Sequence, residues 1–198
     1  MISQRHAHAN NPLMGNLYNP AEPTSYIVYL DANNLYGCAL SQKLPFGAME
    51  WVPREEFEKI EWEKIEEDGD IGYIVECDLE YPPELHDAHN DYPLAPQRLT
   101  IKLGMLSEQQ QKLRIQLGLG GNGESTKLCP NLMDKKNYVV HYRNLKFYLQ
   151  HGMKLRHVHT CLKFEQKAWI APFIDRNSQL RAMTNSDFEK DLYKLLNN

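Results

Sequence analysis

The chain has 198 residues, 42% of them hydrophobic and 24% charged, and its formal net charge is −4. This composition excludes a disordered chain, and the length allows one sizeable core or one core with a small appended unit. No apolar run approaches the roughly 20 residues of a membrane span, and the N-terminus lacks the apolar centre of a secretory signal. We therefore expect an intracellular protein, nuclear or cytoplasmic, without a membrane partner.

The first predicted elements are a loop, a strand and a short helix. Residues 1–24 are rich in Asn, His and Pro and show no periodicity, which indicates a loop. Residues 25–31, SYIVYLD, alternate apolar side chains and predict a strand with Asp31 at its end. A turn and a short helix are expected over residues 32–42, with Tyr36 at the start of the helix.

The middle of the chain predicts a helix, a strand and two irregular stretches. Residues 53–69 begin at a proline and end at a glycine, which predicts a helix with a solvated acidic face. Residues 71–81, IGYIVECDLEY, alternate strictly and predict the clearest strand, adjacent to the strand that ends at Asp31. Residues 82–96 are too rich in proline for regular structure. Residues 118–126 are expected to form a flexible glycine-rich loop, which lacks the Gly-Lys-Ser/Thr ending of a P-loop.

The last part of the chain predicts helix, strand and helix. Residues 134–152 have aromatic and leucine side chains at helical spacing and end at a glycine. Residues 155–164 alternate as a strand, with Val158 and Phe164 on one face, and residues 186–198 begin with a capping box and continue as an amphipathic helix. Because strands and helices do not alternate regularly, the predicted fold class is α+β. The polar side of the last helix carries, at i, i+4 and i+8, Lys190, Lys194 and Asn198.

Charge and metal-ligating residues allow several kinds of site. Residues 1–126 hold 9 basic and 20 acidic residues, and residues 127–198 hold 13 basic and 6 acidic ones. This asymmetry is compatible with carboxylates that bind a metal beside cations that bind phosphates. The four cysteines form no C-x-x-C pair, so we expect reduced and mostly buried thiols. His157 and His159 have no cysteine or third histidine at a suitable spacing, so we do not expect structural zinc.

Two segments resemble motifs of family B DNA polymerases. Residues 29–47, YLDANNLYGCALSQKLPFG, resemble motif A, in which an aspartate at a strand end precedes Leu and Tyr. The glycine at 37 is similar to the protein-primed branch found in transposons of the Polinton/Maverick type, linear plasmids and some viruses. KLLNN, which begins 163 residues after Asp31, resembles the start of motif B, Lys-x-x-x-Asn. The resemblance covers roughly residues 20–198.

The resemblance implies part of a DNA-directed DNA polymerase that adds dNTPs to a primer 3′-hydroxyl by two-metal phosphoryl transfer. Its cofactors would be two Mg²⁺ ions, and its partners primer–template DNA, dNTPs and a terminal protein primer. The remainder of motif B and all of motif C are not in the chain, so we expect the isolated fragment to be inactive. The expected parts are a disordered or cut segment over 1–20, a palm segment with an antiparallel sheet over 21–90, an inserted α/β subdomain similar to a terminal-protein region over 91–175, and the first fingers helix over 176–198.

The resemblance also implies the roles of individual residues. Asp31 would be the catalytic carboxylate that bridges both metal ions, and the carbonyl of Ala32 would complete the nucleotide-side metal. Tyr36 would pack under the sugar and exclude a 2′-hydroxyl, although by itself it could equally be a core aromatic. Lys190 and Lys194 would face the triphosphate, although by themselves they could be ordinary solvent-exposed lysines. The other nucleotide-binding residues would be Asn34, Leu35, Arg181 and Asn198.

Two alternatives belong to other classes of protein. The first is a remnant of a mobile element that binds DNA or a protein partner without catalysis. The second is an unrelated nucleotide-binding module, for which the sequence supplies no phosphate loop. The DNA that follows the codon for Asn198 would separate these alternatives from a polymerase, because a polymerase continues with Ser-x-Phe/Tyr-Gly and a later Asp-x-Asp.

Overall fold

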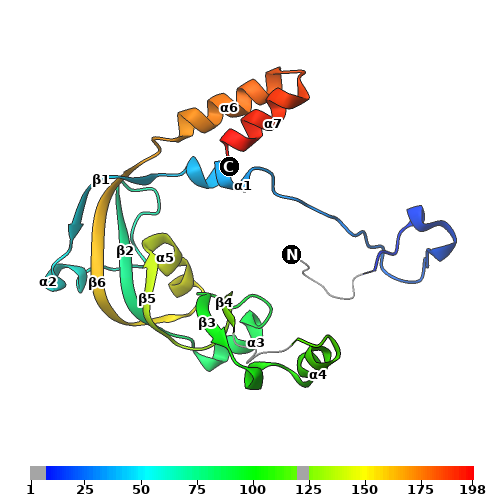
Figure 1. Cartoon of the computed structure of the whole chain (residues 1–198), viewed down its shortest axis with the longest axis horizontal. Coiled ribbons are helices and arrows are strands. Elements are labelled where there is room, and N and C mark those ends of the chain that lie inside the picture. Colours follow the sequence, from blue (N-terminus) through cyan, green and yellow to red (C-terminus); the bar gives the residue numbers. More distant parts are fainter. Residues whose placement is uncertain (1–7, 120–124) are drawn as a thin grey trace. The chain divides into compact units, whose positions relative to one another are not determined.

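The computed structural model describes residues 8–119 and 125–198 (Figure 1). The chain divides into two compact units, Met1–Ala39 with Phe173–Asn198, and Leu40–Pro172. Two pieces of the predicted loops, residues 1–7 and 120–124, lie outside the described residues. Within the described ranges, no helix combines the length and the apolar character that crossing a membrane requires.

The described residues form a mixed α+β protein with antiparallel sheets, as the sequence predicts. The larger unit contains a four-stranded sheet in the order β1-β6-β2-β5, with every neighbouring pair antiparallel. A separate two-stranded sheet pairs β3 with β4. The strands are β1 Leu44–Trp51, β2 Ile71–Glu80, β3 Gln97–Ile101, β4 Ser125–Cys129, β5 Lys135–His141 and β6 Lys154–Lys167.

Most helices are short. Short 3₁₀ helices cover Pro12–Leu17, Pro83–Leu85 and Leu103–Met105. The prediction that residues 82–96 have no regular structure is wrong over residues 83–89, where a 3₁₀ turn is followed by a turn of α-helix. The α-helices are α1 Leu35–Leu40, α2 Arg54–Phe57, α3 His86–His89, α4 Glu108–Gln116, α5 Tyr142–Gln150, α6 Ala171–Met183 and α7 Asp187–Leu196. The sequence reasoning missed α4 and α6. For α4 a signal was present, because Ser107 and Gln110 form a reciprocal capping box.

The predicted strand over 71–81 is confirmed as β2, and it forms the centre of the core. Val75, Cys77 and Leu79 alternate with the polar residues of the strand and are at most 1% exposed. Tyr142 and Leu145 of α5 pack into the same cluster. Burial raises the pKa of the Cys77 thiol to about 12, so this cysteine stays protonated and packs as a small apolar residue.

Strand β6 is confirmed, but bulges shift the face that it presents. Its register with β2 slips twice, between Glu76 and Cys77 and between Asp78 and Leu79. Each slip inserts an additional residue into β6 and reverses the alternation beyond it. As a result Cys161, rather than its neighbours, lies in the main core cluster. Phe164 is buried separately and packs over β2 at Gly72.

Gly72→Ala is expected to lower the free energy of unfolding by about 2 kcal/mol. A Cβ atom at position 72 would lie 2.3 Å from Cε2 of Phe164 and 2.8 Å from Oε1 of Gln166. Both side chains are buried, so the aromatic ring and the sheet would have to shift. Urea unfolding measures the effect. The matched control is Gly47→Ala in β1, where an added Cβ meets no atom within 4 Å; equal losses in the two variants would contradict the packing argument.

The predicted helix over 53–69 is wrong after its first turn. Only α2 is helical, and turns follow it up to β2. A continuous helix would not place all the large apolar side chains of this segment on one stripe. The turns that replace the helix allow Trp62 to enter the core. Trp62 is 6% exposed and meets the ring of Tyr73 edge to face at 5.8 Å.

Two of the acidic residues after Trp62 form ion pairs with α5 although their side chains are exposed. Lys146 of α5 forms an ion pair with Glu67 at 3.3 Å, and Arg143 of the same helix pairs with Asp68 at 2.9 Å. The hydroxyl of Tyr142 also donates to the carbonyl of Glu67 at 2.8 Å. These contacts join the turns of this segment to α5.

The predicted helix over 134–152 is wrong in its first half. Residues 135–141 form β5, and the helix begins only at Tyr142. Asn137 has a positive φ of 49°, which an α-helix cannot contain, and it lies where β5 has an additional residue opposite β2. The side chain of His141 then caps α5 by accepting a hydrogen bond from the backbone N–H of Arg143. The end of the helix near Gly152 agrees with the prediction.

The carboxylate of Asp78 accepts several hydrogen bonds within the four-stranded sheet. Its carboxylate accepts from Nε2 of His159 at 3.0 Å, from the backbone N–H of Asn137 at 2.9 Å and from Nζ of Lys136 at 3.0 Å. The hydrogen bond from His159, followed by those from Asn137 and Lys136, holds the pKa of Asp78 well below its usual range. The folded state therefore favours the charged carboxylate. This stabilisation is complete above the unfolded pKa of about 3.9 and is lost as the pH falls through the lower folded pKa.

Asp78→Asn is expected to lower Tm by about 5 °C at pH 7, because an amide cannot replace the three charge-assisted contacts. The variant should also lose less of its remaining stability than the parent chain between pH 4 and pH 2. Thermal unfolding followed by circular dichroism over this pH range measures both effects. Asp87→Asn, at an exposed position of α3, is the control. Parallel pH profiles of the parent and Asp78→Asn would refute the linkage.

Candidate functional site

All residues that the sequence assigns to a nucleotide site belong to the smaller unit. An asparagine-rich loop precedes the first of them. The side chain of Asn10 donates to the carbonyls of Asn19, Glu22 and Pro23, and Asn10 also pairs with Ser25 through their backbones. The loop expected before residue 25 is therefore a closed structure, in which the buried side chain of Asn10 replaces a hydrophobic core.

The predicted strand over 25–31 is wrong. Residues 26–32 have no regular secondary structure. The apolar side chains of Tyr26, Ile27, Val28, Tyr29 and Leu30 are between 60% and 89% exposed. A strand needs a neighbour for its backbone hydrogen bonds, and no described residue supplies one for this segment. The predicted adjacency of this segment to β2 stays a prediction.

Asn34 and Gly37 form the turn that starts α1. Asn34 has a positive φ of 54°, and its side-chain oxygen accepts a hydrogen bond from the backbone N–H of Gly37 at 3.2 Å. A Cβ atom at position 37 would lie 2.3 Å from Nδ2 of Asn34. The segment Asn-Leu-Tyr-Gly therefore needs glycine in its last place, because the side chain of Asn34 occupies the space that a Cβ atom at position 37 would need.

This turn presents the expected site residues to solvent. Asp31 and Ala32 are exposed in the extended segment before the turn. Tyr36 lies in the first turn of α1, as predicted, and is 68% exposed. In the described structure Tyr36 is thus not a core aromatic. Asp31 forms no hydrogen bond or ion pair with any described residue, so its carboxylate is available to a ligand.

Polar contacts join helices α6 and α7. Nδ2 of Asn177 donates to Oδ1 of Asn197 at 3.1 Å, and Nδ2 of Asn197 donates to Oγ of Ser178 at 3.2 Å. Both asparagines are buried. Sequence reasoning missed this pair, because buried polar contacts leave no hydrophobic periodicity. The predicted capping box is half present, since Ser186 caps the N–H of Glu189 but the Glu189 carboxylate accepts from the hydroxyl of Thr184.

The expected phosphate-binding residues do not all lie on one helix. Lys190 and Lys194 project from α7, where Lys190 is half-buried and pairs with Asp187 at 3.3 Å. Lys194 is exposed and has no ion-pair partner among residues 8–119 and 125–198. Asn198 follows the end of the helix, and Arg181 lies in the last turn of α6.

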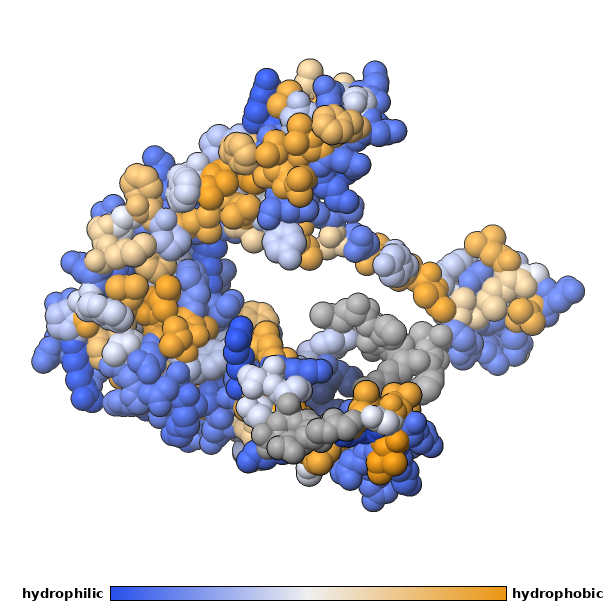
Figure 2. Space-filling model, in the orientation of Figure 1, coloured by the Kyte–Doolittle hydropathy of each residue, from blue (hydrophilic) through white to orange (hydrophobic). Residues whose placement is uncertain are grey.

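The apolar side chains of these two helices are mostly exposed. Figure 2 shows an apolar surface over α6 and α7. The predicted apolar stripe of α7 is confirmed as a stripe but is not covered by described residues. Its members and their neighbours on α6 are Phe173, Met183, Phe188, Leu192, Leu195 and Leu196.

The described residues do not form a complete metal centre. No three His, Cys, Asp or Glu side chains in the described ranges lie close enough to hold a metal ion. Asp31 and the carbonyl of Ala32 offer oxygen ligands of the kind that Mg²⁺ prefers, but a two-metal site needs further carboxylates. The residues present therefore fit one part of such a site and not the whole.

Comparisons with known proteins find similarity only among solved structures. No protein-family model matches the sequence, and no curated protein matches it. A structure of phi29 DNA polymerase complexed with primer–template DNA has a TM-score of 0.43 and 18% identity, and the match covers 85% of this chain and 23% of that one. An orthorhombic crystal form of phi29 DNA polymerase has a TM-score of 0.43 and 19% identity, with 85% and 24% covered. The chain thus spans about a quarter of the length of that polymerase.

Proposed function

We propose that the chain is the part of a protein-primed family B DNA polymerase that runs from motif A to the start of motif B. One observation carries the proposal. The segment Asp31–Gly37 and the helix of Lys190 and Lys194 are far apart in the sequence but belong to the same compact unit. Most of the residues between them, Leu40–Pro172, form a unit of their own. A polymerase needs this arrangement, because both motifs must act on one nucleotide.

The proposed chemistry is template-directed transfer of a nucleotide to a primer 3′-hydroxyl. Two divalent ions supply charge neutralisation in this reaction class, and Asp31 with the Ala32 carbonyl would be the part of their ligand set that this chain provides. Lys190 and Lys194 would neutralise the triphosphate as charge develops on the leaving pyrophosphate. Asn34 would hold the turn that places Leu35 and Tyr36 against the nucleotide, and Arg181 and Asn198 would border it. The proposed partners are primer–template DNA and dNTPs, with a terminal protein as primer.

The proposal predicts that the purified 198-residue chain gives no measurable primer extension with Mg²⁺ and dNTPs, because one carboxylate cannot hold two ions in reacting geometry. The test compares this chain with the protein encoded when the reading frame is followed beyond the codon for Asn198. We expect that frame to encode Ser-x-Phe/Tyr-Gly and then Asp-x-Asp, and its product to extend a primer.

Two results would reject the proposal in different ways. Template-dependent incorporation by the 198-residue chain, lost in Asp31→Asn, would show that the chain needs no further carboxylates. A reading frame that continues without the two motifs would reject the polymerase assignment itself.

A further inference from the structure

Helices α6 and α7 meet through a contact that is mostly polar. Residues 184–186 connect the two helices. Within Phe173–Asn198, all of which the structure describes, three residues are buried, and they are Ile174, Asn177 and Asn197. Two of the three are amides. The hydrogen bond from Nδ2 of Asn177 to Oδ1 of Asn197 is therefore the main buried contact between the helices.

The apolar stripe of α7 lies on the side of the helix that faces away from α6. The residues of α7 and its C-cap that are at least partly covered lie at i, i+3 and i+7, and they are Lys190, Tyr193 and Asn197. The stripe residues Phe188, Leu192 and Leu195 are displaced from that side by about half a turn. They are between 40% and 77% exposed. The two helices thus enclose amides and turn their large apolar side chains outward.

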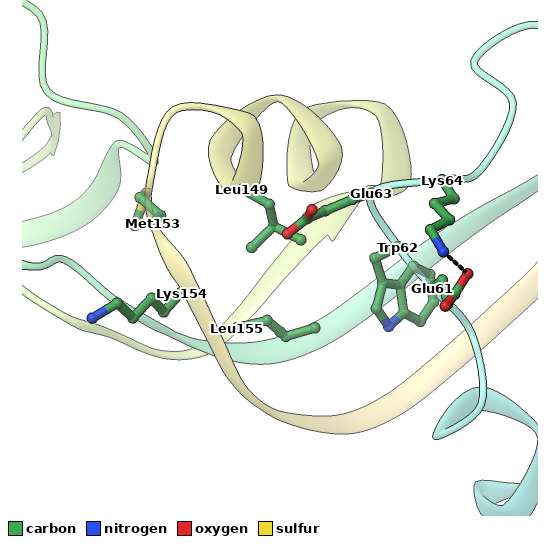
Figure 3. Close-up of a pocket in the computed structure, with 8 residues that line it drawn as sticks. All are labelled: Glu61, Trp62, Glu63, Lys64, Leu149, Met153, Lys154 and Leu155. Atoms are coloured by element: carbon green, nitrogen blue, oxygen red, sulfur yellow. Dashed lines mark ion pairs between the residues drawn. The ribbon is translucent and has the colours of Figure 1, made fainter.

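Helix α5 of the larger unit shows the more common arrangement. Its buried residues are Tyr142, Leu145 and Tyr148. Figure 3 shows Leu149 of the same helix pointing toward β6, where it lines one pocket together with Leu155 and Trp62. Apolar side chains therefore determine which side of α5 faces its neighbours. In α7 the apolar side is equally well defined, but it is not the side that packs on α6.

The hydrophobic effect opposes the observed rotation of α7 about its axis. A rotation by about half a turn would bring the apolar stripe onto α6 and remove its surface from water. The same rotation would break the hydrogen bonds that join Asn197 to Asn177 and Ser178, and a buried amide without a partner is unfavourable. A hydrogen-bonded amide pair fits one geometry, whereas apolar contacts tolerate several. The pair therefore disfavours the rotated arrangement.

We propose that Asn177 and Asn197 are positioning residues, whose amide pair holds α7 in its observed rotation and thereby sets the direction of Lys194. Lys194 lies three residues before Asn197, so a rotation of α7 by about half a turn would point its ammonium to the opposite side. The fixed rotation is a property of the two helices. Its consequence for catalysis rests on the proposed function, in which Lys194 contacts the triphosphate.

Nuclear Overhauser contacts in the 198-residue chain test the rotation. Asn177→Leu combined with Asn197→Leu replaces the amide pair by side chains of similar shape, so it removes the hydrogen bonds and leaves no buried polar group unpaired. In the parent chain, the contacts from α7 to α6 should come from Tyr193. In the variant they should come from Leu192 and Leu195, because the apolar stripe then turns toward α6.

Two further variants separate rotation from general damage. The matched control, Gln179→Leu with Asn185→Leu, adds two leucines at exposed positions and should keep the Tyr193 contacts. Asn177→Ala with Asn197→Ala removes the pair without bulky side chains and should give the same rotation as the leucines. Retention of the Tyr193 contacts in a folded variant without the pair, or their loss in the control, would overturn the proposal. Unfolding of both pair variants would also overturn it, because the pair would then be a requirement for folding.

Nucleotide kinetics test the consequence for Lys194 in the polymerase to which we propose this segment belongs. Replacing both asparagines by leucine should lower kcat/KM for dNTPs about tenfold. It should have no further effect in Lys194→Ala, because the pair acts through that lysine. Equal losses in the two backgrounds would overturn the link to Lys194. A parent polymerase without activity would reject the proposed function alone, because the Overhauser contacts decide the rotation of α7 separately.

Discussion

Asp31→Asn is expected to abolish primer extension by the polymerase to which we propose this segment belongs, with kcat falling about 10³-fold or more. Asparagine keeps the size of the side chain but removes the negative charge that would hold divalent ions next to the reacting phosphate. Asp31 is exposed and pairs with no described residue, so the substitution removes no internal contact of the chain. Single-turnover primer extension at saturating dNTP measures the effect.

A carboxylate elsewhere in the same unit provides the control. Asp175→Asn changes the same charge at an exposed position of α6 and should leave kcat within about twofold of the parent. If Asp31→Asn retained activity similar to that of Asp175→Asn, Asp31 would not be a metal ligand and the motif A assignment would fail.

Tyr36→Ala is expected to reduce the preference for dNTPs over rNTPs about tenfold or more, while dNTP incorporation persists. The ring is 68% exposed at the start of α1, so it can lie under an incoming sugar, where it would leave no room for a 2′-hydroxyl. The tyrosine side chain would exclude the 2′-hydroxyl of a ribonucleotide and would give no hydrogen bond to the reacting phosphate, so its removal should leave dNTP incorporation intact. The measurement is the ratio of kcat/KM for a dNTP and the matching rNTP.

Lys194→Ala is the contrasting variant for this measurement. Lys194 is exposed on α7, and its ammonium would act on the triphosphate, which both nucleotides share. Its loss should therefore lower kcat/KM for the two sugars together and leave their ratio unchanged. An unchanged ratio in Tyr36→Ala would reject the steric gate, and an unchanged dNTP value in Lys194→Ala would reject the phosphate contact.

The elements that sequence predicted well are those whose own pattern decides their structure. Strand β2 has strict alternation, and α7 has a cap and a continuous apolar stripe. The segment over 134–152 shows the limit of such patterns. Its aromatic residues fit helical spacing, but Asn137 adopts a positive φ. The backbone N–H of Asn137 also donates to the carboxylate of Asp78 in β2, which is far away in the sequence. Tertiary contacts therefore select β5 over a longer helix.

Residue spacing and tertiary packing set the same limit elsewhere in the chain. Motif resemblance could propose Asp31, Tyr36 and Lys194 as site residues, because their spacing is written in the sequence. It could not predict that Trp62 is buried, because the contact that covers its ring comes from Tyr73, in a strand that follows the segment.

The exposed apolar segment before Asp31 has a consequence for handling the protein. Tyr26–Leu30 contains five large apolar residues without a charge, proline or glycine, which is the composition that favours stacking of identical strands from different molecules. Asp31 borders this segment and acts as a gatekeeper, because identical charges in register repel one another. Asp31→Asn removes that charge. The variant best suited to test catalysis is thus also the one most prone to aggregate, and its activity has to be measured on the monodisperse fraction.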